Sequence, residues 1–348
     1  MNPYISFTLL FALGLGTTIT FASHHWLLAW MGLEINTLAI IPLMAQLHHP
    51  RAIEATTKYF LIQATAAATL LFAGLSNAWL TGQWDIQHMH HPLLTTLVTL
   101  ALALKIGLAP LHSWMPEVLQ GLDLTTGLIL STWQKLAPLS LMLQIQPTNN
   151  NLLIVLGLMS TLVGGWGGLN QTQLRKILAY SSIAHLGWMV LILQFSPSLT
   201  ILTMLIYISM TFSLFITFKL NHSTNINSLA MSWTKMPALT SLTPLILLSL
   251  GGLPPLTGFM PKWLIIQELV KQQLALTATI AALSALLSLY FYLRLSYTMT
   301  MIISPNNTTG TLPWRTSTQQ LTLPLAISTM MTICLLPITP ALMASLTP

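Results

Sequence analysis

Four ionisable residues lie inside apolar stretches of this chain that are long enough to cross a lipid bilayer. Lys105 is in the run LVTLALALKIGLAPL, Lys135 in GLILSTWQKLAPLSL, Lys262 in GGLPPLTGFMPKWLII and Glu34 in WLLAWMGLEINTLAII. A charge near the centre of a bilayer costs roughly 2.5 to 3.5 kcal/mol on insertion scales, so such a residue usually faces a protein interior or a wet cavity. The four residues therefore predict a path for protons or other ions.

A lysine held away from water can act as a proton switch, because burial destabilises its charged form and a nearby carboxylate stabilises it. Glu34 is the only acid predicted inside the membrane, and Lys105 is its most natural partner. A static ion pair that pins two helices is the alternative interpretation. It does not account for Lys135 and Lys262, whose charge needs deprotonation, water or an acid from another chain.

Two histidines could extend such a path, since an imidazole exchanges protons near neutral pH. His185 lies in AYSSIAHLGWMVL, one turn from two serines, and His112 lies in LAPLHSWMPE. A packed, hydrogen-bonded histidine is the alternative for each. The remaining histidines show no ligand spacing, and Cys334, the single cysteine, cannot alone hold a metal cluster. The sequence predicts no metal site and, lacking a nucleotide-binding motif, no cofactor on this chain.

Transmembrane helices must position these residues, as the composition indicates before any motif does. Charged residues make up 5% of the chain, hydrophobic residues 54%, and the mean hydropathy is +0.73, whereas soluble domains carry roughly 25% charged residues. The predicted fold class is an all-α polytopic membrane protein, with residues 1–348 as a single transmembrane domain. Since a span needs about 20 apolar residues, about eleven are predicted, near 3–22, 26–46, 59–80, 93–112, 123–145, 151–169, 175–195, 199–219, 238–267, 274–297 and 322–345.

The basic residues predict the orientation of these spans. If the spans alternate, eight Lys and Arg residues fall in loops on the side of the N-terminus, and only Lys271 falls on the other side. The positive-inside rule then places the N-terminus on the side of synthesis and the C-terminus across the membrane. Glu117 and Asp123 lie on the basic side, either as solvated loop charges or as acids that collect protons. Scattered basic residues of this kind do not form a nucleic-acid interface.

Two predicted spans carry helix breakers beside a lysine. Pro138 follows Lys135 in the span 123–145, and proline removes a backbone donor and clashes with the preceding turn. Broken helices are tolerated at membrane depth where they are buried or line a cavity, and transporters use their ends to hold ions. Simple kinks are the alternative. The span 238–267 contains more breakers ahead of its lysine: Gly251, Gly252, Pro254, Pro255, Gly258 and Pro261.

Four stretches together resemble the antiporter-like membrane subunits of respiratory complex I, a family shared with multisubunit Na⁺/H⁺ antiporters. They are KIGLAPLHSWMPEV, STWQKLAPL, LNQTQLRKILAYSSIAHLGWM and SLGGLPPLTGFMPKW. The resemblance implies antiporter-like inverted repeats. The first half-repeat would contain a discontinuous helix at 123–145, the second one at 238–267, and C-terminal helices would follow over 274–345. It also implies that several N-terminal spans are missing, which would open a lateral surface for a neighbouring subunit.

The resemblance also implies roles for particular residues. Glu34 and Lys105 match the glutamate and lysine of a first pair, Lys135 the central lysine, Lys262 the lysine of the second broken helix, and His185 a bridge between the last two. These would relay protons across the mitochondrial inner membrane, with the N-terminus on the matrix side and the C-terminus on the intermembrane side. FMN, iron–sulfur clusters and ubiquinone would lie in other subunits.

The expected partners are the other membrane-arm subunits of the complex, especially neighbouring antiporter-like subunits, together with lipids. Two other functions stay open from the sequence. One is a cation/proton antiporter subunit, which would use the same broken helices and lysines to bind its substrate. The other is a structural membrane subunit that does not pump and only bridges its neighbours.

Overall fold

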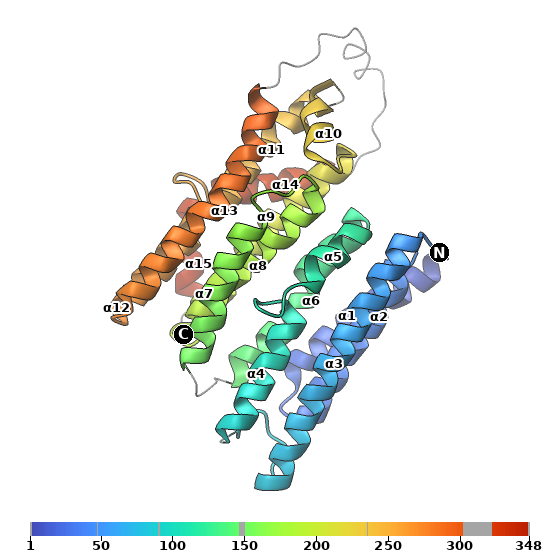
Figure 1. The fold of residues 1–348 in the computed structure, drawn as a ribbon, viewed down its shortest axis with the longest axis vertical. Helices are drawn as coiled ribbons and strands as arrows, with labels where there is room; N and C mark the ends of the chain where they lie inside the picture. Colours follow the sequence, from blue (N-terminus) through green and yellow to red (C-terminus); the bar gives the residue numbers. More distant parts are fainter. Residues whose placement is uncertain are drawn as a thin grey trace. The chain divides into compact units, whose positions relative to one another are not determined.

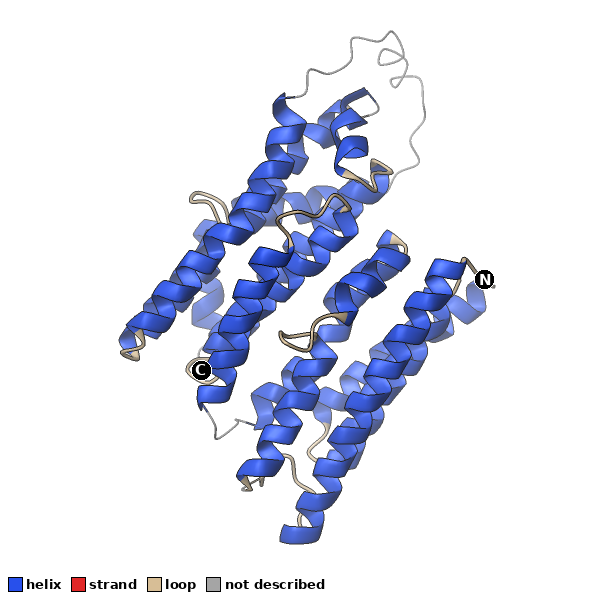
Figure 2. Ribbon diagram, viewed as in Figure 1, coloured by secondary structure: helices blue, strands red, loops and turns tan. Residues whose placement is uncertain are grey.

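The computed structural model describes residues 2–46, 48–89, 91–145, 150–234, 236–301 and 322–346. Across these ranges the regular secondary structure is helical, and the extended contacts amount to two isolated bridges (Figure 2). The chain divides into two compact units, Met1–Gly157 and Leu158–Pro348. Each unit is a bundle of helices with its own buried apolar side chains.

The first unit is built around α3, which packs against α2, α4 and α5, while α6 packs against α1, α2 and α4. Gly16 and Gly32 allow a very close approach of α1 and α2, since a Cβ on either would lie 2.8 Å from the other's carbonyl oxygen. The helices (Figure 1) are α1 (Pro3–Ala22), α2 (Trp26–Met44), α3 (Pro50–Thr81), α4 (Pro92–Ile106), α5 (Trp114–Gly121) and α6 (Leu124–Ile145), followed by α7 (Asn150–Gly167) across the boundary of the units.

The second unit is built around α9, which packs against α8, α11, α12, α14 and α15, while α13 packs against α8, α10, α11 and α12. Its helices are α8 (Leu174–Ile192), α9 (Pro197–Leu220), α10 (Ile226–Ala230), α11 (Pro237–Gly251), α12 (Phe259–Lys271), α13 (Ala275–Met301), α14 (Thr322–Cys334) and α15 (Thr339–Leu346). Short 3₁₀ turns, Met231–Thr234 and Leu336–Ile338, follow α10 and precede α15.

Five helices of the described chain are long and apolar enough to cross a membrane: α1, α2, α3, α9 and α13. The pair formed by α14 and α15, bent by 68°, is a sixth candidate, and α4, α7 and α11 are shorter apolar helices. Every stretch predicted from hydropathy contains a helix, which confirms the all-helical membrane fold. The number of spans stays a prediction.

One of the two predicted helix breaks was placed on the wrong helix. α6 runs without interruption from Leu124 to Ile145, with Pro138 inside it. A single proline removes one backbone donor, which a packed helix can absorb as a kink. Within 238–267, the chain leaves the helix between α11 and α12. The first break lies instead between α4 and α5, where residues 107–113 leave the helix.

Candidate functional site

The two helix breaks have the same local backbone. α4 ends at Ile106 and α11 at Gly251. The next residues, Gly107 and Gly252, have φ angles of 87° and 81°, in the left-handed region that favours glycine. The amides of Gly107 and Leu108 both donate to the Ala103 carbonyl, each at 2.9 Å, and those of Gly252 and Leu253 donate to Leu248 at 3.1 and 3.3 Å. In both breaks, therefore, a left-handed glycine and the residue after it close the last turn of the helix.

The sequence contains this repeat, although Lys135 and Pro138 predict the first helix break in 123–145 instead. The segment GLAPLHSWMP at 107–116 and the segment GLPPLTGFMP at 252–261 are identical at six of ten positions. Each includes one cis peptide bond before proline, Ala109–Pro110 and Pro254–Pro255. A search of the chain against itself, rather than for lysines near prolines, identifies the two breaks.

Side chains from two helices cap the exposed carbonyl groups at the end of α4. The indole of Trp114, in the first turn of α5, donates to the Leu104 carbonyl at 3.2 Å, and the amide of Gln63 on α3 donates to the Lys105 carbonyl at 3.4 Å. Tyr59 lies edge-on to Trp114, with ring centroids 5.8 Å apart. The last carbonyls of a helix lack partners within it, so these contacts stabilise the break from outside.

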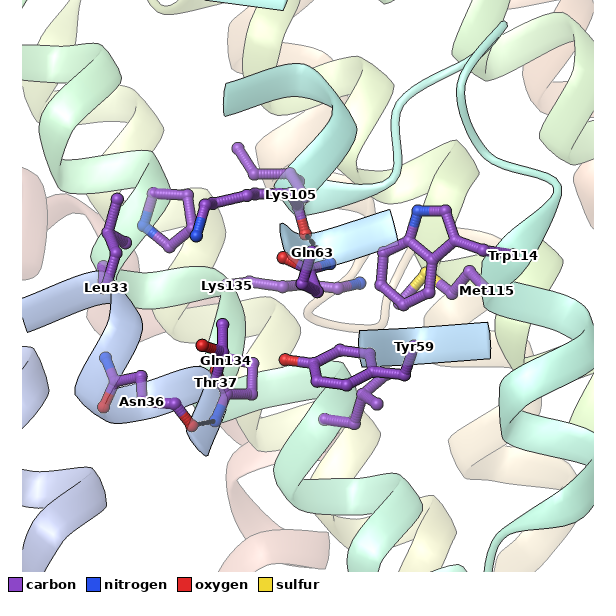
Figure 3. Close-up of a pocket in the computed structure, with 14 residues that line it drawn as sticks. Leu33, Asn36, Thr37, Tyr59, Gln63, Lys105, Trp114, Met115, Gln134 and Lys135 are labelled. Carbon is purple, nitrogen blue, oxygen red and sulfur yellow. Dashed lines mark hydrogen bonds between the residues drawn. The ribbon is translucent and has the colours of Figure 1, made fainter. Parts of the chain in front are cut away.

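Lys105 and Lys135 line one enclosed cavity in the first unit (Figure 3). Their side chains are 6% and 2% exposed, and no described residue accepts a hydrogen bond from the Lys105 amine. The space open to the centre of a water molecule is about 10 Å³, enough for about one water. The cavity also has polar lining residues that the sequence reasoning missed: Asn36, Thr37, Tyr59, Gln63 and Gln134.

Glu34 forms no ion pair with Lys105 among the described residues. The half-buried carboxylate accepts a hydrogen bond from the Thr37 hydroxyl at 3.0 Å. Within the described part of the first unit, no ion pair of 4.0 Å or less joins Glu34 to Lys105. Glu34 remains within electrostatic reach of Lys105 and Tyr59. The predicted partners thus interact electrostatically without an ion pair of 4.0 Å or less.

Lys262 caps the second break with its own amine. It lies in the first turn of α12, and its Nζ donates to the Gly251 carbonyl at 2.8 Å. Gly252 makes room for this contact, because a Cβ there would lie 2.9 Å from both Cδ and Nζ of Lys262. A cation at the C-terminal end of a helix is favoured by the helix dipole. Lys262 also lines an open hollow of about 350 Å³ whose aromatic residues include Trp188 and Trp263.

The two candidate histidines lie in different settings. His185, on α8, is half-buried, and its ring centroid is 5.5 Å from that of Tyr207. The hydroxyls of Ser181 and Ser182 donate to carbonyls of their own helix, at 2.8 and 2.7 Å. His112 lies in the connection between α4 and α5, with Nδ1 3.3 Å from the Pro110 carbonyl oxygen. Neither histidine lines the cavity of Lys105 or the hollow of Lys262.

The predicted lysines thus separate into a pair and a single residue. Lys105 and Lys135 share a cavity in the first unit. In the second unit, Lys262 bonds to the Gly251 carbonyl and lines a separate hollow. Over the described residues, no three His, Cys, Asp or Glu side chains gather as a metal site. This arrangement places a lysine beside each of the two helix breaks, buried at the first and half-buried at the second.

Sequence comparison assigns the chain to a family over most of its length. Residues 23–288 match the transmembrane family of NADH:quinone oxidoreductase and Mrp antiporter subunits. The chain belongs to this family. Residues 289–343 match the C-terminal family of NADH dehydrogenase subunit 2.

Relatives of this family member cover nearly its whole length. The NADH-ubiquinone oxidoreductase chain 2 of Tetraodon nigroviridis is 74% identical over 343 residues, 99% of each chain. The chain 2 of Salmo salar is 70% identical over 348 residues, 100% of each.

Solved structures share the fold of this family member. A chain of respiratory complex I from Thermus thermophilus is 26% identical, with a TM-score of 0.87, and the match covers 99% of this chain and 81% of that one. A chain of the Mrp complex from Dietzia sp. DQ12-45-1b, at 17% identity and a TM-score of 0.79, covers 97% of this chain and 76% of that one, and shows similarity of fold alone.

Proposed function

We propose that this chain is the chain 2 membrane subunit of a proton-translocating NADH:ubiquinone oxidoreductase and that its buried lysines carry the protons. Full-length relatives bearing that name support the first part. The observation that carries the second part is the cavity shared by Lys105 and Lys135, in which the Lys105 amine has no hydrogen-bond partner among the described residues.

The lysine pair is suited to electrostatic coupling. Two ammonium groups lining one enclosed cavity repel each other strongly, because the interaction is weakly screened away from water. Protonation of Lys105 therefore disfavours protonation of Lys135. Glu34 opposes this repulsion, since it lies within electrostatic reach of Lys105 but is not in contact with it. A change in the separation of Glu34 and Lys105 then moves a proton on or off Lys135.

In this proposal the proton continues from Lys135 by way of His185 to Lys262 and leaves on the opposite side of the membrane. Lys262 can bind it, because the Gly251 carbonyl already accepts a hydrogen bond from the amine. A hydrogen bond fixes the Lys262 amine at a carbonyl, whereas the Lys105 amine has no hydrogen-bond partner among the described residues.

The redox reaction takes place elsewhere in the complex under this proposal. FMN, iron–sulfur clusters and ubiquinone belong to other subunits, and the family's motifs on this chain supply only the proton path. The partners are neighbouring membrane-arm subunits and lipids. The protein lies in the mitochondrial inner membrane, with the N-terminus on the matrix side, in accordance with the basic loops on that side.

Replacing the central lysine tests the proposal. In assembled enzyme reconstituted into vesicles, Lys135→Met is expected to abolish most proton translocation and to reduce quinone reduction with it, while assembly stays normal. The control is Lys271→Met, which removes a lysine that is 62% exposed and lies in an ion pair with Glu268. An unchanged ratio of protons to electrons and an unchanged turnover in Lys135→Met would show that the subunit is structural.

A further inference from the structure

A second, open hollow lies beside the lysine cavity of the first unit. It has a volume of about 350 Å³, and its lining is largely polar: Arg51, Glu54, Ala55, Lys58, Glu117, Gln120 and Gly121. The inner cavity is lined by neighbours of these residues, Tyr59 on α3 and Trp114 and Met115 on α5. Because a helix rises 1.5 Å per residue, Glu117 lies only about 4.5 Å along α5 from Trp114. The two spaces are separated by about one helical turn.

Lys58 joins two carboxylates in the open hollow. Its amine lies 2.7 Å from Glu54 and 2.9 Å from Glu117, and the three side chains are 41%, 63% and 55% exposed. Exposed ion pairs of this kind contribute little to stability, because water solvates both charges. The group is therefore hydrated, and a proton from water can reach either carboxylate.

Packing already holds α5 against α3 without these charges. A Cβ at Gly121 would lie 2.7 Å from the Arg51 carbonyl oxygen and 2.8 Å from the Ala55 Cβ, so the two backbones approach closely. The edge contact of Tyr59 with Trp114 adds to this packing. Glu117 is thus not required to dock α5.

Under the proposed function, the buried Lys105 amine needs a supply of protons. Lys105 is buried, with 6% of the residue exposed, and no described residue accepts a hydrogen bond from its amine. Tyr59 and Trp114 line the cavity of this amine, and Lys58 and Glu117, close to them on α3 and α5, line the open hollow.

We propose that Glu117 collects protons for the Lys105 cavity; this inference rests on the proposed function. The Glu117 carboxylate takes a proton from water in the open hollow and gives it to water that passes the Tyr59–Trp114 contact. The neutral Lys105 amine accepts a proton from that water and becomes an ammonium, and Glu117 returns to its ionised form. Glu117 thus collects protons on the side of the membrane where the basic loops are predicted.

Glu54 provides a matched comparison. Glu54 shares Lys58 with Glu117 and is similarly exposed. Along α3, Lys58 is next to Tyr59, and Glu54 lies one helical turn before Lys58. Glu54 is therefore farther along its helix from a residue that lines the inner cavity than Glu117 is from Met115 on α5. The two carboxylates therefore differ mainly in how close they lie to the residues that line the inner cavity.

The test compares Glu117→Gln, Glu117→Asp, Glu54→Gln and Lys58→Met in assembled enzyme reconstituted into vesicles. Glu117→Gln should lower coupled turnover several-fold. Glu117→Asp, which keeps a carboxylate, should restore most of it, and Glu54→Gln should match the unaltered enzyme. Lys58→Met should have less effect than Glu117→Gln, because it leaves the Glu117 carboxylate in place.

Two results would overturn the inference. One is normal coupled turnover in Glu117→Gln. The other is an equal loss in Lys58→Met and Glu117→Gln without rescue by Glu117→Asp, which would identify the ion pair as a structural link. Lys105→Met is measured in parallel: if pumping persists in that variant, the proposed function fails, whereas loss of pumping in Lys105→Met alone rejects only the role of Glu117.

Discussion

The break between α4 and α5 and the break between α11 and α12 share a backbone but differ in the side chains that cap it. Trp114 and Gln63, both neutral, donate to the last carbonyls of α4. At the second break, the donor to the Gly251 carbonyl is the amine of Lys262. Trp114 corresponds to Phe259 in the repeat, which has no donor to offer.

The two lysines lie on opposite sides of the repeated segment, since Lys105 precedes its first copy and Lys262 follows its second copy. At the first break, neutral residues donate to the carbonyl groups. The amine of Lys105, which lines the cavity, has no hydrogen-bond partner among the described residues. Where the lysine itself is the cap, its amine is held by a hydrogen bond to the carbonyl at the end of α11. The two lysines therefore differ in whether a hydrogen bond within the described chain fixes the amine.

The largest effect is expected from Gly258→Ala in the second break. A Cβ at Gly258 would overlap the Ser249 carbonyl oxygen, which is backbone and cannot move aside easily. The expected loss is about 4 kcal/mol or more of stability, seen as failure of the subunit to assemble. The corresponding residue of the first break is Ser113, which is exposed, so Ser113→Ala should assemble normally; equal behaviour of the two variants would contradict the difference in packing.

The two lysines should respond differently to removal of their amines. Lys262→Met leaves the Gly251 carbonyl without its donor and should cost about 1 to 3 kcal/mol in addition to proton transfer. Lys105→Met breaks no hydrogen bond between described residues, so pumping should fall while thermal stability of the assembled enzyme is kept. Thermal dissociation and proton translocation are measured on both variants. A larger stability loss in Lys105→Met would contradict the assignment of caps.

The smallest effect is expected from Trp114→Phe, which gives the first break the aromatic type of the second. It removes the donor to the Leu104 carbonyl while keeping a ring against Tyr59. The loss of one such hydrogen bond should lower stability by about 1 kcal/mol, measured by thermal dissociation. Trp263→Phe, in a side chain that is 56% exposed, serves as the control and should change stability by less than about 0.5 kcal/mol.

Much of the fold could be predicted from the sequence because hydropathy is a local property. The predicted spans 3–22 and 123–145 agree with α1 and α6 to within one residue at each end. The helix α3 begins at Pro50, nine residues before its predicted start, because its first turns are polar and carry Arg51 and Lys58. Hydropathy reports the apolar part of a helix and not its polar extension.

The sequence by itself determined that this is an all-helical membrane protein with lysines in apolar segments, since composition and periodicity express the demand of a bilayer for satisfied backbone groups. It also contained the two matching glycine and proline segments. Only the tertiary structure decided that Lys105 shares a cavity with Lys135, that Glu34 forms no ion pair with Lys105 among the described residues, and that Lys262 bonds to Gly251. These outcomes depend on which side chains from distant helices reach each carbonyl, and contacts between distant residues are set by packing.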